Sequence, residues 1–283
     1  MLLVPQALLL LESNGSARWL AWSAEFDEAW RPALEDLVRA FGERPAGVTC
    51  PEAIFAQPFG DDRVIVCRVC DQANGLGFHT LALTTADYAA AGAHPFAIAA
   101  AVPALWEARG SSLPAASLPP LERLPTTSEI GDILRRPEGP LLLGTVQALV
   151  DGNRGAWVRP EPAGELLAGL WHLLPLRCRQ ELWPASFAFS NKLQFHAVVV
   201  PQVRAEEFDF RYLSEAQLEN YPEGAYEARL QSAAEHGDEG LLAKLLLRRS
   251  HSDTLRLGFW LLAGMLALSI LAGAIKVLQN LQR

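Results

Sequence analysis

The chain has 283 residues, half of them hydrophobic and a fifth charged, so its composition is that of a folded protein and excludes a largely disordered chain. Its formal net charge of −8 argues against nucleic acid as the main partner, because binding to phosphates needs clustered lysines and arginines. Four cysteines are too few for a disulfide scaffold, and we expect them to be reduced thiols in a cytosolic domain.

The N-terminal residues predict a β-hairpin rather than a secretion signal. Pro5 interrupts the apolar run, which also lacks a charged start and a cleavage site of small residues. We therefore expect a buried strand over 6–12 and a return strand over 18–23. The dipeptide Asn14-Gly15 between them is typical of a tight turn.

The stretch CRVCDQANGLGFH, residues 67–79, combines a C-x-x-C pair with a histidine. It belongs to a predicted strand–loop–strand unit over 63–83, with its loop at 71–75. Residues three apart on a strand point to opposite faces, so we do not expect Cys67 and Cys70 to bind one metal ion. A redox pair would need a helix that begins just after the strand. We therefore predict two buried strand cysteines, and neither a metal nor another cofactor.

Polar side chains of the same unit form a candidate interaction surface. Arginine and histidine on either side of an Asn-Gly loop suit the recognition of a carboxylate or a phosphate. The alternative is that these groups are the solvated edges of a hairpin. The candidate residues are Arg63, Arg68, Asp71, Asn74 and His79.

A change of composition after the N-terminal region predicts a domain boundary. Residues 111–125 are rich in proline and small polar residues, which suits a linker on the surface. The linker would separate an N-terminal α+β domain, 1–110, from a middle α+β domain, 126–212. Within these domains we expect helices over 85–91, 95–106 and 126–136, and a buried strand over 141–150.

The block EPAGELLAGLWHLLPLRCRQELWPASFAFS, residues 161–190, has leucines at helical spacing up to Leu174, and Pro175 ends that helix. Further along the chain, Ser214 and Gln217 form a capping box for another helix. The remaining predicted elements are a short helix over 176–182, strands over 185–189 and 195–200, and amphipathic helices over 225–236 and 239–249 within a helical connector, 213–254.

The strongest signal lies near the C-terminus, where the run LGFWLLAGMLALSILAGAI, residues 257–275, contains no charge. A helix of this length covers roughly 28 Å, close to the ~30 Å hydrocarbon core of a bilayer. Lysines and arginines are more frequent before the run than after it, which predicts that the preceding chain is cytoplasmic. We therefore expect a tail-anchored, single-pass inner-membrane protein with a transmembrane helix over 255–277 and a short tail over 278–283. The residues that mark the span are Leu257, Trp260, Gly264, Ser269, Gly273 and Ile275.

Sequence motifs of hydrolases and nucleotide-binding enzymes are absent: the chain has no G-x-S-x-G elbow, no H-E-x-x-H and no Walker loop. Any histidine could meet a serine, cysteine or aspartate in space, but a lone histidine in an apolar strand, such as His196, is more often a satisfied core residue. One enzymatic alternative stays open, a membrane-tethered hydrolase that uses His79 with Cys67 or Cys70.

Two stretches, RVCDQANGLGFHTLALTTADYAAAGAHPF and LLAGLWHLLPLRCRQELWPASFAFS, residues 68–96 and 166–190, together resemble the GTPase-associated proteins of bacterial conflict systems. The first is similar to an N-terminal pattern of an arginine and a Gly-Asn-type loop before a His-bearing apolar strand. The second is similar to a middle region in which a helix ends in Leu-Pro, an arginine follows and a Ser-Phe strand closes the unit. The matching positions are Arg68, Asn74, His79, Leu174, Pro175, Arg179, Ser186 and Phe187.

This sequence departs from the family pattern in its Asn74-Gly75 order, in the residues after Phe187, and in a membrane anchor where the family would have a C-terminal region. The resemblance implies a non-catalytic adaptor that engages a GTPase or another effector. We therefore expect an α+β interaction protein at the inner membrane, with the lipid bilayer and a protein such as a GTPase as partners, and an enzyme only as the alternative.

Overall fold

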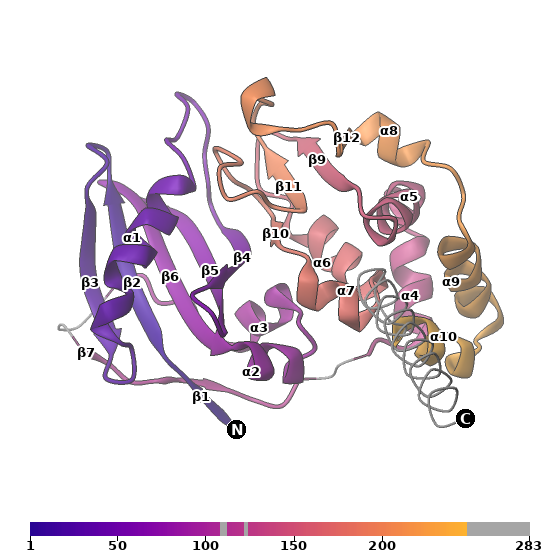
Figure 1. Ribbon diagram of the computed structural model, residues 1–283, viewed down its shortest axis with the longest axis horizontal. Coiled ribbons are helices and arrows are strands. Elements are labelled where there is room, and N and C mark those ends of the chain that lie inside the picture. The colour runs from indigo at the N-terminus through magenta and orange to yellow at the C-terminus, as the bar shows by residue number, and fades with distance from the viewer. Residues whose placement is uncertain (108–111, 122–123, 248–283) are drawn as a thin grey trace, which may run out of the picture. The chain divides into compact units, whose positions relative to one another are not determined.

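The computed structural model describes residues 1–107, 112–121 and 124–247, which belong to one compact unit with an α+β fold. Within these residues the main sheet has ten strands in the order β12-β9-β11-β10-β4-β5-β6-β2-β3-β7 (Figure 1). In that order the strands are β12 (Tyr212–Ser214), β9 (Arg154–Val158), β11 (Ala197–Val200), β10 (Pro184–Ala185), β4 (Ala53–Phe59), β5 (Arg63–Gln72), β6 (Gly75–Thr84), β2 (Gln6–Glu12), β3 (Ala17–Ser23) and β7 (Ser112–Leu113).

The half of the sheet from β4 to β3 is antiparallel and begins with the predicted N-terminal hairpin, β2 and β3, which is confirmed. The loop predicted at 71–75 is shorter than expected. Pairing between β5 and β6 continues to Gln72 and Gly75, so that only Ala73 and Asn74 form the turn. Gly75 has a φ of +153°, and a Cβ there would lie 2.0 Å from the carbonyl oxygen of Leu11 on β2. A glycine is therefore required where the turn meets the neighbouring strand.

The other half, β12-β9-β11-β10, is parallel, and β10 joins it to the antiparallel half by pairing with β4. The prediction of a strand over 141–150 is wrong, because these residues form helix α5 (Gly139–Val150). α5 is buried on nearly all sides and lacks a polar stripe, so its short apolar run could not be told from a buried strand by periodicity. The strand predicted over 185–189 is largely wrong, because only Ala185 of it belongs to a strand, β10. The strand predicted over 195–200 is shorter than expected, as β11, and lies parallel to β10.

The two faces of the antiparallel half are covered by different elements. Helix α1 (Arg31–Ala40) packs on the face that carries Ile65, Cys67 and Val69. Helices α2 (Thr85–Ala90) and α3 (Pro95–Ala101) pack on the opposite face, which carries Val64 and Val66. This second face is also covered by a two-stranded sheet of β1 (Leu2–Val4) and β8 (Ala116–Leu118). The predicted helix over 95–106 is thus real but ends at Ala101.

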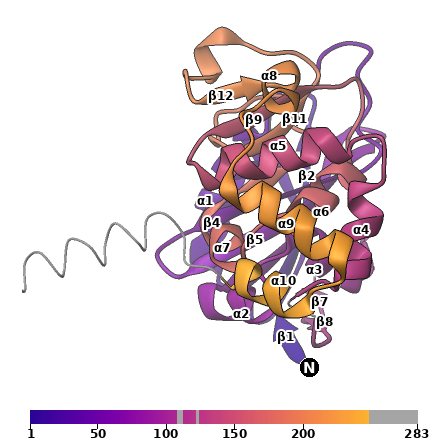
Figure 2. The ribbon, with the colours of Figure 1, turned by 90° about the vertical axis from the view of Figure 1, so that its right-hand side faces the viewer.

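The remaining helices pack beside the parallel half of the sheet (Figure 2). The helix predicted over 126–136 and the capping box of Ser214 and Gln217 are both confirmed. These helices are α4 (Thr127–Leu134), α5, α6 (Gly164–Leu173), α7 (Leu176–Glu181), α8 (Glu215–Glu219), α9 (Ala225–His236) and α10 (Glu239–Leu246), and two 3₁₀ turns lie at Glu28–Trp30 and Ala205–Glu207.

The proline-rich segment expected as a linker lies along the sheet. Its residues form β7, which pairs with β3, and β8, which pairs with β1. In addition, Nε2 of Gln6 donates a hydrogen bond to the carbonyl oxygen of Pro114 at 2.7 Å. One sheet thus includes strands from both 1–110 and 126–212.

Among the described helices, none is both long and apolar enough to cross a bilayer. The predicted transmembrane helix over 255–277 and the tail over 278–283 lie outside the described residues.

Candidate functional site

The alternation of side chains along the strands separates the polar residues that the sequence singles out. Arg68 and His79 are partners in the register of β5 and β6 and lie on the face covered by α2 and α3. Arg63 and Asp71 lie on the other face, because they differ from Arg68 by an odd number of positions. Asn74 lies in the turn. The five residues therefore do not form one continuous surface.

Two of these residues have local partners that account for their position. The guanidinium of Arg63 lies 4.3 Å from the centre of the Trp30 ring. Asp71 accepts hydrogen bonds from Nη1 of Arg44 at 2.6 Å and from the backbone N–H of Cys50 at 2.7 Å. Arg63 and Asp71 thus fasten neighbouring segments to the ends of β5.

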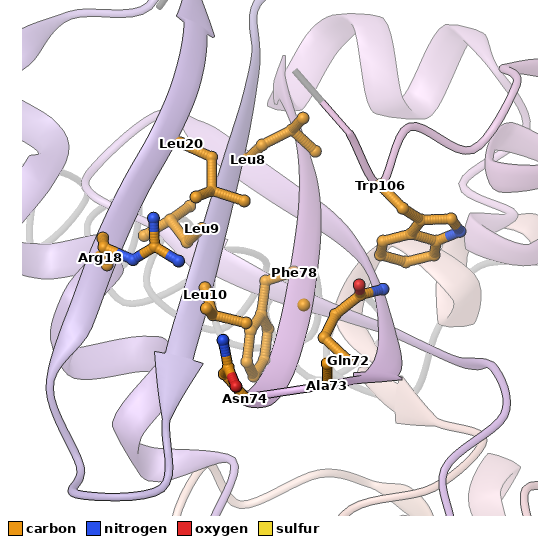
Figure 3. A pocket seen from close by; sticks show the side chains of 11 residues that line it. Leu8, Leu9, Leu10, Arg18, Leu20, Gln72, Ala73, Asn74, Phe78 and Trp106 are labelled. Atoms are coloured by element: carbon orange, nitrogen blue, oxygen red, sulfur yellow. The ribbon is translucent and has the colours of Figure 1, made fainter. Parts of the chain in front are cut away.

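Asn74 borders a small pocket of about 170 Å³ beside the turn (Figure 3). Leucine side chains of β2 and β3 form much of its wall, and the indole of Trp106 lies across from them. Arg18, Gln72 and Asn74 supply the polar groups. The hollow beside the predicted loop therefore combines apolar walls with a few polar groups rather than forming a cluster of charges.

His79 is 2% exposed, and both of its ring nitrogens have partners. Nδ1 accepts a hydrogen bond from the backbone N–H of Leu105 at 3.4 Å, and Nε2 lies 2.8 Å from Oε1 of Gln6. Because Nδ1 is an acceptor, the ring proton is on Nε2, which donates to Gln6. Burial and the nearby charge of Arg68 lower the pKa of His79 to about 4. His79 is thus a neutral structural group that fastens residue 105 to the sheet.

The thiols have the properties expected of buried strand cysteines. Cys67 lies on the face opposite to His79, within hydrogen-bonding distance of Thr80, and burial raises its pKa to about 12. Cys70 shares the face of His79 and accepts a hydrogen bond from Nε2 of Gln72 at 2.9 Å. Neither arrangement gives a thiolate activated by His79, so the geometry does not favour the hydrolase alternative.

In residues 1–247, as far as they are described, no group of three or more metal-ligating side chains occurs.

A different place brings chemically active side chains together. An open pocket of about 500 Å³, which we call the histidine pocket, lies between α3, α6 and the ends of β4 and β5. Its walls combine two imidazoles, a guanidinium, a hydroxyl and two carboxylates with apolar side chains. The lining residues are Glu52, Ile54, Arg68, His94, Phe96, Ala97, Ala100, Gly164, Glu165, Ala168, His172 and Ser186.

His94 is the most buried titratable group in this pocket, with 4% of its surface exposed. Its Nδ1 caps α3 by accepting a hydrogen bond from the backbone N–H of Ala97 at 3.2 Å, so the ring proton is on Nε2. Among the described residues, Nε2 has no partner with full hydrogen-bond geometry, but backbone carbonyls of Ala168 and of His94 itself lie close enough to the ring to favour its protonation. Burial, together with the charges of His172 and Arg179, holds the pKa of His94 well below its ordinary value. The ring is therefore a neutral, buried group that packs between the start of α3 and the backbone of α6.

His172 lies against His94, with ring centres 4.4 Å apart and planes inclined by 54°. It belongs to the last turn of α6, and its position depends on Arg179. The buried guanidinium of Arg179 donates from Nη2 to the carbonyl oxygen of His172 at 3.0 Å and from Nε to that of Leu174 at 2.9 Å. Pro175, which ends α6, brings α7 and Arg179 back to these carbonyls. Leu174, Pro175 and Arg179 thus fix the position of His172.

Arg68 forms part of the same pocket from the sheet side. Its Nη2 donates to the carbonyl oxygen of Ala99 in α3, and its Nε lies 3.5 Å from Oε1 of Glu52. The Arg68 side chain is 11% exposed, whereas that of Glu52 is 52% exposed. Burial lowers the pKa of Arg68, and the charge of Glu52 opposes this shift. The guanidinium is therefore largely desolvated and only loosely paired.

Ser186 connects the pocket to the sheet. Its Oγ accepts a hydrogen bond from the backbone N–H of Ile54 at 2.8 Å, and its own N–H donates to the Ile54 carbonyl at 2.8 Å. The Ser186 carbonyl accepts from the N–H of Ala163, just before α6. Phe187, the next family-matching position, is fully buried in the core. Ser186 thus fixes the first residues of α6 at the mouth of the pocket.

The sequence does not reveal the histidine pocket, because its residues come from distant segments. His94 stands out only as a histidine before a proline at a helix start, and His172 only as a polar residue inside an apolar helix. His196, by contrast, is half-buried, and its Nδ1 accepts a hydrogen bond from the N–H of Trp183 at 3.2 Å. Compared with known proteins, the sequence matches no family model, and no curated protein is significantly similar to it.

Proposed function

We propose that this chain is an interaction protein, or adaptor, which a transmembrane helix over 255–277 holds at the inner face of a membrane. In this proposal the histidine pocket receives a protein partner, such as a GTPase or another effector. The observation that carries the proposal is the convergence of Arg68, His94 and His172 on one open pocket of about 500 Å³. A concave surface that combines apolar walls with a few convergent polar groups is suited to binding another molecule.

The positions of the family resemblance support this choice of surface. Arg68 and Ser186 line the pocket, and Arg179 holds the backbone that carries His172. The resemblance implies an adaptor encoded with a small GTPase, which is why a GTPase is the first partner to test. The buried thiols, with their raised pKa values, lend no support to the enzymatic alternative.

The test uses the full chain, purified in detergent and immobilised, with a detergent extract of the native cells. Wild type is compared with the double variant Arg68→Ala, His172→Ala and with Arg177→Ala, which changes an arginine on the outer side of α7 whose side chain is 49% exposed. We expect wild type and Arg177→Ala to enrich the same GTPase at least ten-fold, and the double variant to lose it. Equal enrichment by all three chains would refute the pocket as the contact site.

Membrane attachment is tested separately by fractionation of cells that express the full chain or a chain ending at residue 247. The full chain should sediment with inner membranes, and protease added to inside-out vesicles should digest it. Recovery of the full chain in the soluble fraction would contradict the proposed anchor.

A further inference from the structure

We propose that the compact unit lies directly on the surface of the bilayer that holds its anchor, with the outer face of β1 and the end of α10 against the lipid. A phospholipid bilayer is thus the partner of this apolar surface. The inference rests on the membrane anchor of the proposed function and is independent of the histidine pocket.

Large apolar side chains exposed to solvent gather at two ends of the compact unit. Leu3, in β1, is 67% exposed, and Leu247, directly after α10, is 60% exposed. β1 and α10 lie toward the lower end of the molecule in both Figure 1 and Figure 2, whereas β9 and β12 lie toward the upper end. The exposed large apolar residues that the structure describes are Met1, Leu3 and Leu247 near β1 and α10, and Val158, Val203 and Phe210 in the segments next to β9, β11 and β12.

The exposure of Leu3 follows from strand geometry. Leu3 pairs with Ser117 in the two-stranded sheet of β1 and β8, and both side chains are exposed on its outer face. Val4 and Leu118, one position further along each strand, are buried in the core that this sheet forms with α2. Side chains alternate along a strand, so successive apolar residues cannot all face the core. The fold therefore holds Leu3 in a place where the described residues leave it in water.

The apolar surface continues beyond β1. Met1 and Leu2 border a hollow of about 220 Å³, whose other walls come from α2 and from the Leu-Pro-Pro-Leu segment at 118–121. Asp87, the acidic residue of this lining, accepts a hydrogen bond from Oγ1 of Thr84 at 2.6 Å. A bilayer at this end would therefore meet apolar side chains and a carboxylate that already has a partner.

The place where the chain leaves the compact unit selects which apolar end faces the membrane. The described residues end at Leu247, and seven residues, 248–254, join it to the proposed span over 255–277. Even fully extended, these seven residues would cover at most roughly 28 Å. So short a tether makes contact between this end and the lipid an intramolecular event, so a few apolar side chains are enough to hold it. β12, near which Phe210 lies, is farther from this attachment (Figures 1 and 2).

Charge near α10 suits the anionic surface of a membrane. Lys244 is exposed in the last turn of α10, three positions before Leu247, so the two side chains are neighbours on the helix surface. Two arginines, 248–249, follow in the sequence. Glu239, at the start of the same helix, accepts hydrogen bonds from the N–H and the hydroxyl of Thr127 at 2.9 and 2.7 Å. Cations beside a span attract anionic headgroups, and exposed aliphatic side chains add insertion into the interface.

Acidic residues near α2 limit how this end approaches the membrane. Asp61 and Asp62 are exposed in the turn before β5, and the Asp62 carbonyl accepts a hydrogen bond from the N–H of Thr85 at the start of α2, at 2.7 Å. Carboxylates are repelled by anionic headgroups. We therefore expect this turn to stay in water while β1 and the end of α10 make the contact.

The test places single cysteines on the full chain and measures their contact with lipid. Leu3→Cys and Ser117→Cys place a thiol on the outer face of β1 and β8, and Phe210→Cys places one at a residue that is 93% exposed near β12. The four native cysteines are buried, so a bimane reagent labels the new site in the native chain. Each labelled chain is reconstituted into vesicles of phosphatidylethanolamine and phosphatidylglycerol, about 3:1, with or without phospholipid that is brominated in its acyl chains.

We expect brominated lipid to quench the Leu3→Cys and Ser117→Cys labels about two-fold or more and to leave the Phe210→Cys label unchanged. Equal fluorescence of all three labels, in chains that float with the vesicles, would refute the docked surface while the anchor stands. A blue shift of the Leu3→Cys label without quenching would also refute it, because protein rather than lipid would then cover this face. Chains that fail to float with the vesicles would refute the anchor and the docked surface together.

Discussion

Nη2 of Arg179 donates a hydrogen bond to the carbonyl oxygen of His172 at 3.0 Å, and this contact fixes the end of α6 that carries the histidine into its pocket. The arginine is almost fully buried, and burial lowers its pKa to about 10. A second hydrogen bond runs from Nε of Arg179 to the carbonyl oxygen of Leu174. One side chain therefore pairs two carbonyls at the end of α6, where the helix itself has no further N–H groups to pair them.

Replacing Arg179 should therefore be costly even by an apolar side chain of similar length. Arg179→Met leaves both carbonyls without their donor, and we expect the free energy of unfolding to fall by about 2–4 kcal/mol. Denaturant unfolding followed by tryptophan fluorescence measures the change. Arg177→Met on the same helix is the control, since Arg177 is half exposed, and should change stability by less than about 0.5 kcal/mol. Similar losses for both variants would contradict the assigned role.

Gly144 and Gly131 should respond in opposite ways to alanine. A Cβ at Gly144 in α5 would lie 2.1 Å from the carbonyl oxygen of Leu218, which is backbone and cannot easily move. We expect Gly144→Ala to destabilise the fold by roughly 1–3 kcal/mol. At Gly131 in α4 no atom lies within 4 Å, so Gly131→Ala should stabilise the fold by about 0.5–1 kcal/mol. Thermal unfolding of both variants checks the prediction, which fails if Gly144→Ala is neutral.

Buried histidines should make stability depend on pH. The pKa values of His79 and His196 fall from 6.5 to about 4 in the folded chain, mainly through burial. The folded state therefore holds both rings neutral, so their contribution is complete above pH 6.5 and is lost as the pH falls toward 4. Removing one of these groups with His79→Gln should reduce the slope of unfolding free energy against pH by up to about 1.4 kcal/mol per pH unit. An unchanged slope between pH 6.5 and 5 would show that His79 does not titrate as described.

The core thiols should be inert in the native protein. Cys50 and Cys67 are fully buried, and burial is the largest cause that raises the pKa of each to about 12. At pH 8 we expect a maleimide reagent to label neither within minutes, whereas both should be labelled in denaturant. Ala73→Cys, at an exposed position of the β5–β6 turn, is the positive control. Mass spectrometry of labelled peptides identifies each site, and native labelling of Cys67 at the rate of the control would revive the hydrolase alternative.

Local signals in the sequence were sufficient to predict several helices and strands. The Asn14-Gly15 turn between alternating apolar residues predicted the first hairpin, and the capping box of Ser214 and Gln217 predicted the start of α8. The failures have physical causes. Helix α5 has no polar stripe, so its apolar run allowed a strand as readily as a helix. The prolines of 111–125 suggested a linker, but tertiary pairing with β1 and β3 overrode that local preference.

The candidate site could be predicted only in part. Arg68 was singled out because it flanks a turn, but its pocket partners His94 and His172 come from segments whose meeting depends on the whole topology. Two other residues of the predicted polar surface, Arg63 and Asp71, lie on the face of the sheet opposite to Arg68, because side chains alternate along a strand. The periodicity of apolar residues predicts which side chains share a face of one helix or strand. It does not predict which helices and strands pack against one another.

The edge of β4 that pairs with β10 stays open until a much later part of the chain has been synthesised. The backbone N–H of Ile54 binds Oγ of Ser186, 132 positions later in the sequence. At roughly 5–20 residues per second, the ribosome needs on the order of ten seconds to deliver the strand that covers this edge of β4. During that interval β4 exposes unpaired backbone groups that invite pairing with other chains. We therefore expect the nascent chain to be most prone to pairing with other chains before residues 184–186 have been synthesised.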